Sequence, residues 1–166
     1  MTKQNKITII GMPWAGKTTT AKALAEKLDY EFIDLDQEVE KEEGMNLIEI
    51  MNTKGADYFR QKGFEYLQKF TPEDRVIISP AGSVIYNERS MNWLKGNSLV
   101  IFLDTPFEVI EARSKTEPKA VANLKERGLQ GIWDERIPIY EKNSDLTVET
   151  VGKSLDEIVE DIIKVI

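Results

Sequence analysis

The chain contains neither cysteine nor histidine. Without cysteine it has no disulfides, no thiolate nucleophile and no thiolate metal site. Without histidine it has no imidazole base and no histidine metal ligand, so every Ser-His-Asp arrangement is excluded. Any catalysis must therefore use carboxylates, lysine, arginine, hydroxyl groups and backbone amides, together with a metal ion held by oxygen atoms.

Positive charge and long hydrophobic runs are also scarce. The 166 residues include 22 Lys and Arg against 29 Asp and Glu, which gives a net charge of −7 at pH 7. This balance argues against nucleic acid and against anionic membranes as partners. The apolar runs at 7–10 and 99–103 are too short for a signal peptide or a membrane span. We therefore expect a cytoplasmic protein.

Short apolar runs alternate with amphipathic segments along the chain, whose length and 41% hydrophobic content suit one globular domain over residues 1–166. Strands are expected at 6–10, 31–33, 75–78, 99–103 and 145–148, and helices at 17–28, 36–43, after 46, after 55 and from a cap at 154 to 163. The strands at 76–78 and 99–103 are apolar on both faces. The sequence therefore predicts a three-layer α/β fold, in which helices cover both faces of a five-stranded parallel sheet.

Residues 11–18, Gly-Met-Pro-Trp-Ala-Gly-Lys-Thr, match the phosphate-loop pattern G-x-x-x-x-G-K-[ST] between a strand and a helix. The glycines let backbone N–H groups turn toward a phosphate, and the helix start adds free amides and a positive dipole end. Lys17 is expected to reach the β- and γ-phosphates, and the Thr18 hydroxyl to bind Mg²⁺. The predicted ATP site comprises Gly11, Met12, Pro13, Trp14, Ala15, Gly16, Lys17, Thr18 and Thr19.

Three further motifs resemble those of the shikimate kinase family. Asp-Leu-Asp at 34–36 is similar to its D-x-D, residues 55–60 to its G-x-x-x-F-R, and residues 136–140 to its R-x-P-L-Y. The similarity extends over essentially the whole chain. It implies the P-loop kinase fold, ATP and Mg²⁺ as cofactors, a monomer, and transfer of the γ-phosphate to a hydroxyl of a small carboxylate. Shikimate, an intermediate of aromatic amino acid biosynthesis, is the leading candidate.

The resemblance also implies roles for individual residues. Asp34 would hold Mg²⁺, and Asp36 would orient the attacking hydroxyl, although Asp36 also suits the N-cap of the following helix. Arg60 and Arg136 would clamp the substrate carboxylate, because a guanidinium group forms two parallel hydrogen bonds to it. Gly82 lies where the backbone of the family approaches the substrate.

The charged segment 114–131 is predicted to be a mobile lid, although its composition is equally consistent with an ordinary surface helix and loop. Arg127 is expected to swing over the γ-phosphate and neutralise charge during transfer. Three lysines are alternatives for this role, namely Lys115, Lys119 and Lys125. By the resemblance, Arg113 would pack on the adenine through a cation–π contact.

Three positions depart from the family pattern. Ser-Pro-Ala-Gly-Ser at 79–83 replaces a run of three glycines, Gly63 stands where a glutamate orients the first arginine, and Trp14 replaces a loop glycine. We expect Trp14 to lie exposed beside the nucleotide or substrate. These departures leave three alternatives open: a nucleotide-binding regulator without transfer activity, a kinase of another small hydroxy acid, and a nucleoside monophosphate kinase.

Overall fold

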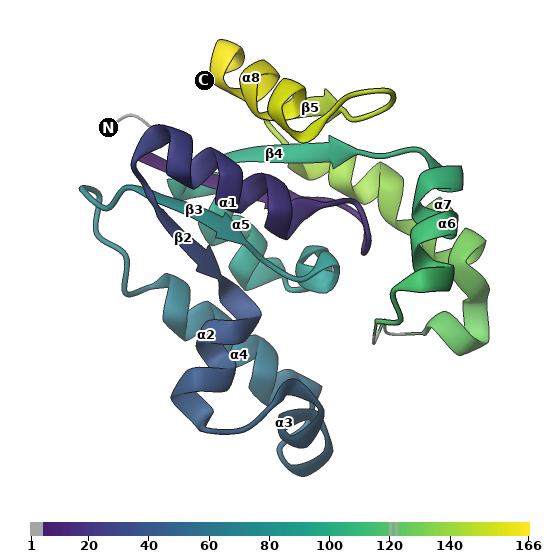
Figure 1. Cartoon of the computed structure of the whole chain (residues 1–166). Coiled ribbons are helices and arrows are strands. Elements are labelled where there is room, and N and C mark those ends of the chain that lie inside the picture. Colours follow the sequence, from purple (N-terminus) through teal and green to yellow (C-terminus); the bar gives the residue numbers. More distant parts are fainter. Residues whose placement is uncertain (1–4, 120, 122) are drawn as a thin grey trace.

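The computed structural model describes residues 5–119, 121 and 123–166, and its strands form one five-stranded sheet of order β2-β3-β1-β4-β5 (Figure 1). Each strand pairs in parallel with its neighbours. The strands are β1 (Lys6–Ile10), β2 (Glu31–Asp34), β3 (Val76–Ser79), β4 (Leu99–Asp104) and β5 (Leu146–Glu149). The predicted sheet is therefore confirmed, with every strand within one residue of its expected bounds.

In the described part of the chain, these strands are connected by helices with and without side-chain caps. They are α1 (Lys17–Leu28), α2 (Leu35–Glu43), α3 (Leu47–Thr53), α4 (Ala56–Leu67), the 3₁₀ helix η2 (Gly82–Tyr86), α5 (Glu88–Asn97), α6 (Phe107–Thr116), α7 (Leu124–Asn143) and α8 (Leu155–Val165). Asn46 and Ser154 each form a capping box at the start of α3 and α8, which satisfies free amides of the first turn. Helix α5, capped by Asn87, was not predicted, because only Ser90, Met91 and Leu94 of it are buried.

The hydrophobic core has two halves, one on each face of the sheet. Because successive strand residues point to opposite faces, both halves draw on the same strands. One face carries Ile9, Ile77 and Ile101 against α1 and α8, and the other carries Ile10, Ile78 and Phe102 against α5 and α7. This arrangement confirms the three-layer fold. No helix in the described part of the chain is long and apolar enough to cross a membrane.

The position of β3 between β1 and β2 was not predicted, and it determines where the functional residues meet. In a parallel sheet all the carboxyl ends lie at one edge. The phosphate loop after β1, the Asp34–Asp36 segment at the end of β2 and the 79–83 turn at the end of β3 therefore share that edge. Figure 1 shows α2, α3 and α4 grouped beyond the end of β2, while α6 and the first part of α7 lie beyond the end of β4 and the rest of α7 runs back along the sheet.

The predicted lid segment 114–131 includes the end of α6 and the beginning of α7. Helix α7 is interrupted at Gly128, whose φ of 68° and ψ of 169° are not helical, so the chain kinks there. Residues 120 and 122 of this segment lie outside the described residues. That the segment moves remains a prediction.

Candidate active site

The phosphate loop is shaped by backbone conformations that glycine adopts most easily. Gly11 has a φ of 150°, and a Cβ there would lie 3.0 Å from the carbonyl oxygen of Leu103. Gly16 has a φ of 88° and precedes α1, which has no side-chain cap. The Lys17 ammonium folds back over the loop and donates to the Met12 carbonyl at 2.8 Å. Free amides and an ammonium thus face the same space, as polyphosphate binding requires.

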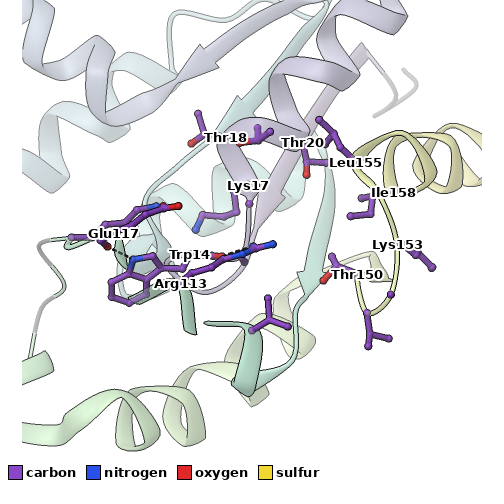
Figure 2. A pocket seen from close by; sticks show the side chains of 17 residues that line it. Trp14, Lys17, Thr18, Thr20, Arg113, Glu117, Thr150, Lys153, Leu155 and Ile158 are labelled. Atoms are coloured by element: carbon purple, nitrogen blue, oxygen red, sulfur yellow. Dashed lines mark hydrogen bonds between the residues drawn. The ribbon is translucent and has the colours of Figure 1, made fainter. Parts of the chain in front are cut away.

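The larger of two cavities beside Lys17, here called the large cavity, has a volume of about 530 Å³ (Figure 2). It is lined by residues 14–20 of the loop and α1, by Val109, Arg113, Glu117 and Lys119, and by residues 150–153, Leu155 and Ile158 near the amino end of α8. Val151 and Leu155 are 58% and 38% exposed and give this cavity an apolar wall. An apolar residue in the polar turn after β5 is the sequence signal that could have revealed this wall. The cavity suits a flat, partly apolar base joined to phosphates.

The smaller space, here called the small cavity, has a volume of about 210 Å³ and lies on the other side of Lys17. It is lined by Pro13, Lys17, Thr18, Asp34, Asp36, residues 79–83, Lys119, Val121 and Arg136. Lys17, Thr18 and Lys119 line both cavities. A group passing from one cavity to the other would therefore pass between two ammonium groups and a hydroxyl.

Arg136 is the most informative side chain of the small cavity. It is only 2% exposed, and its guanidinium lies 5.3 Å from the ring centre of Tyr86. Its Nε has no hydrogen-bond partner among the residues that the structure describes. Burying a cation with an unpaired donor is costly, and an anionic ligand removes that cost. The small cavity is therefore suited to a carboxylate or a phosphate.

Lys17 and Asp36 have strongly shifted pKa values. Burial lowers the pKa of Lys17 to about 7, and the positive charge of Lys119 acts in the same direction. Burial raises the pKa of Asp36 to about 7, and the negative charge of Asp34 adds to the effect. The mutual attraction of the two groups only partly opposes these shifts. Both groups therefore exchange protons near neutral pH, which is typical of catalytic sites.

We expect the Lys17–Asp36 pair to take up protons when MgADP binds at pH 8. With a pKa of about 7 the free Lys17 is mostly neutral at that pH, and the phosphates raise its pKa, so it becomes protonated on binding. Calorimetric titrations in buffers of different ionisation enthalpy measure the proton number. The uptake should fall sharply at pH 6. The number of protons taken up at pH 8 should fall in Lys17→Met but not in the control Lys22→Met, which lies on the exposed side of α1. An equal proton number at pH 8 and pH 6 in the unmodified protein would contradict the lowered pKa of Lys17.

The two carboxylates after β2 have different roles from those that the cap pattern suggested. Asp34, not Asp36, is the N-cap of α2, because its Oδ1 accepts from the Gln37 amide at 3.2 Å. Asp36 lies in the first turn, lines the small cavity and accepts a hydrogen bond from the Ala81 amide. Its carboxylate is therefore available to a ligand.

A divalent cation would find few protein ligands here. The described residues contain no group of three or more acidic side chains that could hold a metal. Thr18 and Asp34 line the same cavity, so they can supply one or two oxygen ligands. This limited set fits Mg²⁺ bound mainly by phosphate oxygens and water.

Gly82 brings the 79–83 turn against the phosphate loop. A Cβ at this position would lie 3.1 Å from both Pro13 Cδ and the Tyr140 hydroxyl, and 3.2 Å from the Gly11 carbonyl. The Tyr140 hydroxyl also donates to the Gly82 carbonyl at 2.7 Å. Only glycine fits this space without displacing a neighbour, so the predicted substrate residue Gly82 lines the small cavity and lets the 79–83 turn lie directly against the phosphate loop.

Arg60 does not share the small cavity with Arg136. It lies on α4 with half of its side chain exposed and donates to Asp57 at 2.7 Å. It lines a neighbouring recess that also contains Asp36 and Gly63. An exposed ion pair is worth only about 1 kcal/mol or less, so an anion near Asp36 can draw Arg60 away from Asp57. The structure thus brings Arg136 to the site but leaves Arg60 at its edge.

The expectation that Trp14 is exposed was wrong. Its φ of 65° is left-handed, which costs about 1–2 kcal/mol for a non-glycine residue, and its side chain is 3% exposed within the core. Arg113 ends up near it, at the large cavity, and donates through Nη1 to the Trp14 carbonyl at 2.8 Å. The loop is therefore attached to α6 through this residue.

The two lid cations are placed differently from the prediction. Arg127 forms an ion pair with Glu135 and lines neither cavity. Lys119, named only as an alternative, lines both. It is exposed and has no hydrogen bond or ion pair to any residue that the structure describes. Lys119 is therefore better placed than Arg127 to meet a phosphate.

A phosphate loop whose lysine separates a nucleotide-sized cavity from a smaller one with a buried arginine is the arrangement of a P-loop kinase that phosphorylates small molecules. The shikimate kinase family model matches residues 13–166, and the chain belongs to that family. It is therefore a phosphotransferase that acts on a hydroxyl group.

Individual relatives agree with this assignment. The shikimate kinase of Persephonella marina is 36% identical over 160 residues, which cover 95% of this chain and 96% of the relative. That of Aquifex aeolicus is 35% identical over 161 residues, covering 95% and 94%. The solved structure of Acinetobacter baumannii shikimate kinase in complex with shikimate is similar at a TM-score of 0.83 and 28% identity, covering 96% of this chain and 91% of that one.

Proposed function

We propose that this chain transfers the γ-phosphoryl group of ATP to a hydroxyl group of shikimate. The observation that carries the proposal is the buried Arg136 guanidinium, whose Nε lacks a partner among the described residues, in a cavity of about 210 Å³ beside Lys17 and Asp36. This cavity has the size and charge for a small hydroxy-carboxylate. Family membership and the similarity to a shikimate-bound structure support the same acceptor.

The donor would occupy the large cavity. The base would lie between Arg113 and the exposed apolar residues Val151 and Leu155, with the phosphates on the loop amides. Lys17 would then neutralise charge on the transferred group. Thr18 and Asp34 would hold Mg²⁺, which when bound offsets phosphate charge and orients the donor.

The acceptor would lie in the small cavity with its carboxylate on Arg136. Asp36 would accept the proton of the attacking hydroxyl, because a carboxylate with a pKa of about 7 is matched to that task near neutral pH. Lys119 would approach the transferred phosphoryl group from the lid in place of Arg127. The support for Lys119 is its position on both cavities.

One observation favours another small hydroxy acid as acceptor. Gly63 replaces the glutamate expected to orient Arg60, and Arg60 lies in the neighbouring recess. A smaller acid that needs only Arg136 would fit this arrangement. Magnesium as the cation, a cytoplasmic location and a monomeric state remain predictions.

The decisive experiment is a coupled assay of ADP release with MgATP, using shikimate and a panel of related hydroxy acids. We expect shikimate to give the highest kcat/KM, with a phosphate monoester as product by ³¹P NMR. Faster turnover of another acid would replace shikimate as the acceptor. If no acid is turned over while calorimetry shows that MgADP binds, the chain is a nucleotide-binding regulator.

Arg136→Met is expected to raise the KM for shikimate at least about 30-fold, since a charge-assisted hydrogen-bond pair is worth about 2–3 kcal/mol. Methionine keeps much of the volume, so the KM for ATP should change less than about threefold. Steady-state kinetics measures both constants. Arg89→Met, which removes an exposed arginine over the Phe64 ring, is the control. Equal effects on the two KM values would contradict a carboxylate contact at Arg136.

A further inference from the structure

Trp14 joins the phosphate loop to the beginning of the lid segment (Figure 2). Its indole Nε1 donates to the Glu117 carbonyl at 2.6 Å, although the two residues are 103 positions apart. Its own carbonyl accepts from Arg113 at 2.8 Å. Among the residues that the structure describes, no other hydrogen bond joins segment 114–131 to the loop. One loop residue therefore holds both the last turn of α6 and the residue after it.

The attachment of the lid segment depends on the tryptophan side chain of Trp14, with its buried ring and its indole donor. A tryptophan with a φ of 65° is strained, and such strain persists only where the surroundings fix it. The ring is 3% exposed, and its single polar atom is satisfied by Glu117. A glycine would adopt the same backbone conformation more easily but would provide neither the ring nor the donor.

The attachment point lies close to Lys119 along the chain. Glu117 precedes Lys119 by two residues, a span of at most about 7 Å in extended chain. Fixing the Glu117 carbonyl on the loop therefore confines Lys119 to the neighbourhood of the phosphates. Lys119 lines both cavities together with Lys17.

We propose that Trp14 is a positioning residue, which holds the lid segment so that Lys119 faces the transferred phosphoryl group. This inference rests on the proposed function, because it assigns Lys119 its task there. Trp14 itself touches no reacting atom: it acts on catalysis through the lysine two residues beyond its hydrogen-bond partner.

A double-mutant cycle on the full chain tests this coupling. Trp14→Phe keeps an aromatic ring but removes the donor, and we expect it to lower kcat about tenfold. Lys119→Met alone should lower kcat more, and the double variant should match Lys119→Met within about threefold, because no lysine remains to be positioned. Trp93→Phe, at a partly buried tryptophan packed on Phe70, should leave kcat within about twofold. A double variant in which the two effects multiply would overturn the proposal, because Trp14 would then act independently of Lys119.

A measurement on the unmodified sequence guards against misfolding of the variant. With ¹⁵N-labelled tryptophan, the Trp14 indole N–H should exchange with solvent at least about tenfold more slowly than that of Trp133, which is partly buried and whose indole N–H donates to no residue that the structure describes. Equal exchange rates would overturn the contact. This measurement needs no acceptor substrate. A failure of the proposed function would appear as no turnover of shikimate by the unmodified chain, whereas a failure of the Trp14 contact would appear in the exchange rates alone.

Discussion

Asp36→Asn is expected to lower kcat by about 10²–10⁴-fold, the range that a general base contributes, and to change the KM for ATP less than about threefold. Asparagine keeps the size of the side chain and can accept the hydrogen bond from the Ala81 amide, but it cannot take up the proton of the attacking hydroxyl. Steady-state kinetics with saturating shikimate measures the effect. Glu42→Gln, an exposed carboxylate on the same helix paired with Lys69, is the matched control. Near-normal turnover in Asp36→Asn would remove Asp36 from the chemistry.

The same substitution should stabilise the ligand-free protein. The folded-state pKa of Asp36 is raised from 3.8 to about 7, so the folded chain binds a proton that the unfolded chain releases. The free energy of unfolding therefore decreases as the pH rises from the unfolded-state pKa to the folded-state pKa of Asp36, and it stays lower at higher pH. At pH 8 the variant should be more stable by about 1–2 kcal/mol, or about 3–6 °C in Tm, and at pH 4 the difference should vanish. A Tm gain that is the same at both pH values would contradict the raised pKa.

Lys119→Met is expected to lower kcat by about 10²–10³-fold, somewhat less than a fully ordered arginine contributes at a transferred phosphoryl group. Lys119 is exposed, so its loss should leave Tm nearly unchanged. Arg127→Met is the matched control from the same segment, and its kcat should fall less than about threefold because Arg127 is paired with Glu135. The opposite ranking, with Arg127→Met the more damaging variant, would return the role to Arg127.

The sheet and the phosphate loop could be predicted from the sequence because both depend on local patterns. Strand β1 and helix α1 have the predicted bounds, since a β-branched run and an apolar helical face are visible without tertiary information. The strand order was not predictable in this way. Whether β3 pairs with β1 depends on how the helices between them pack, and it is this pairing that brings Gly82 to the phosphate loop.

The errors within the site arose from backbone conformation and from helix boundaries. Trp14 was expected to be exposed because its φ cannot be read from the sequence, and the left-handed value coincides with a buried ring. Asp36 also suited the N-cap of α2 because two aspartates lie within two residues of the helix start, and Asp34 occupies the position instead. The kinked helix α7 contains both Arg127 and Glu135, and spacing alone does not reveal that they pair.

The close fit of Gly82 against Pro13, the Gly11 carbonyl and the Tyr140 hydroxyl has a thermodynamic consequence. Gly82 lines the small cavity, and residues 14–18 of the phosphate loop that it packs against line the large cavity, so a shift of this contact would alter the walls of both. Under the proposed function, we expect occupancy of one cavity to change the affinity of the other, and linkage requires the factor to be the same in both directions. Donor and acceptor should accordingly bind with equal and reciprocal cooperativity, whichever of them arrives first.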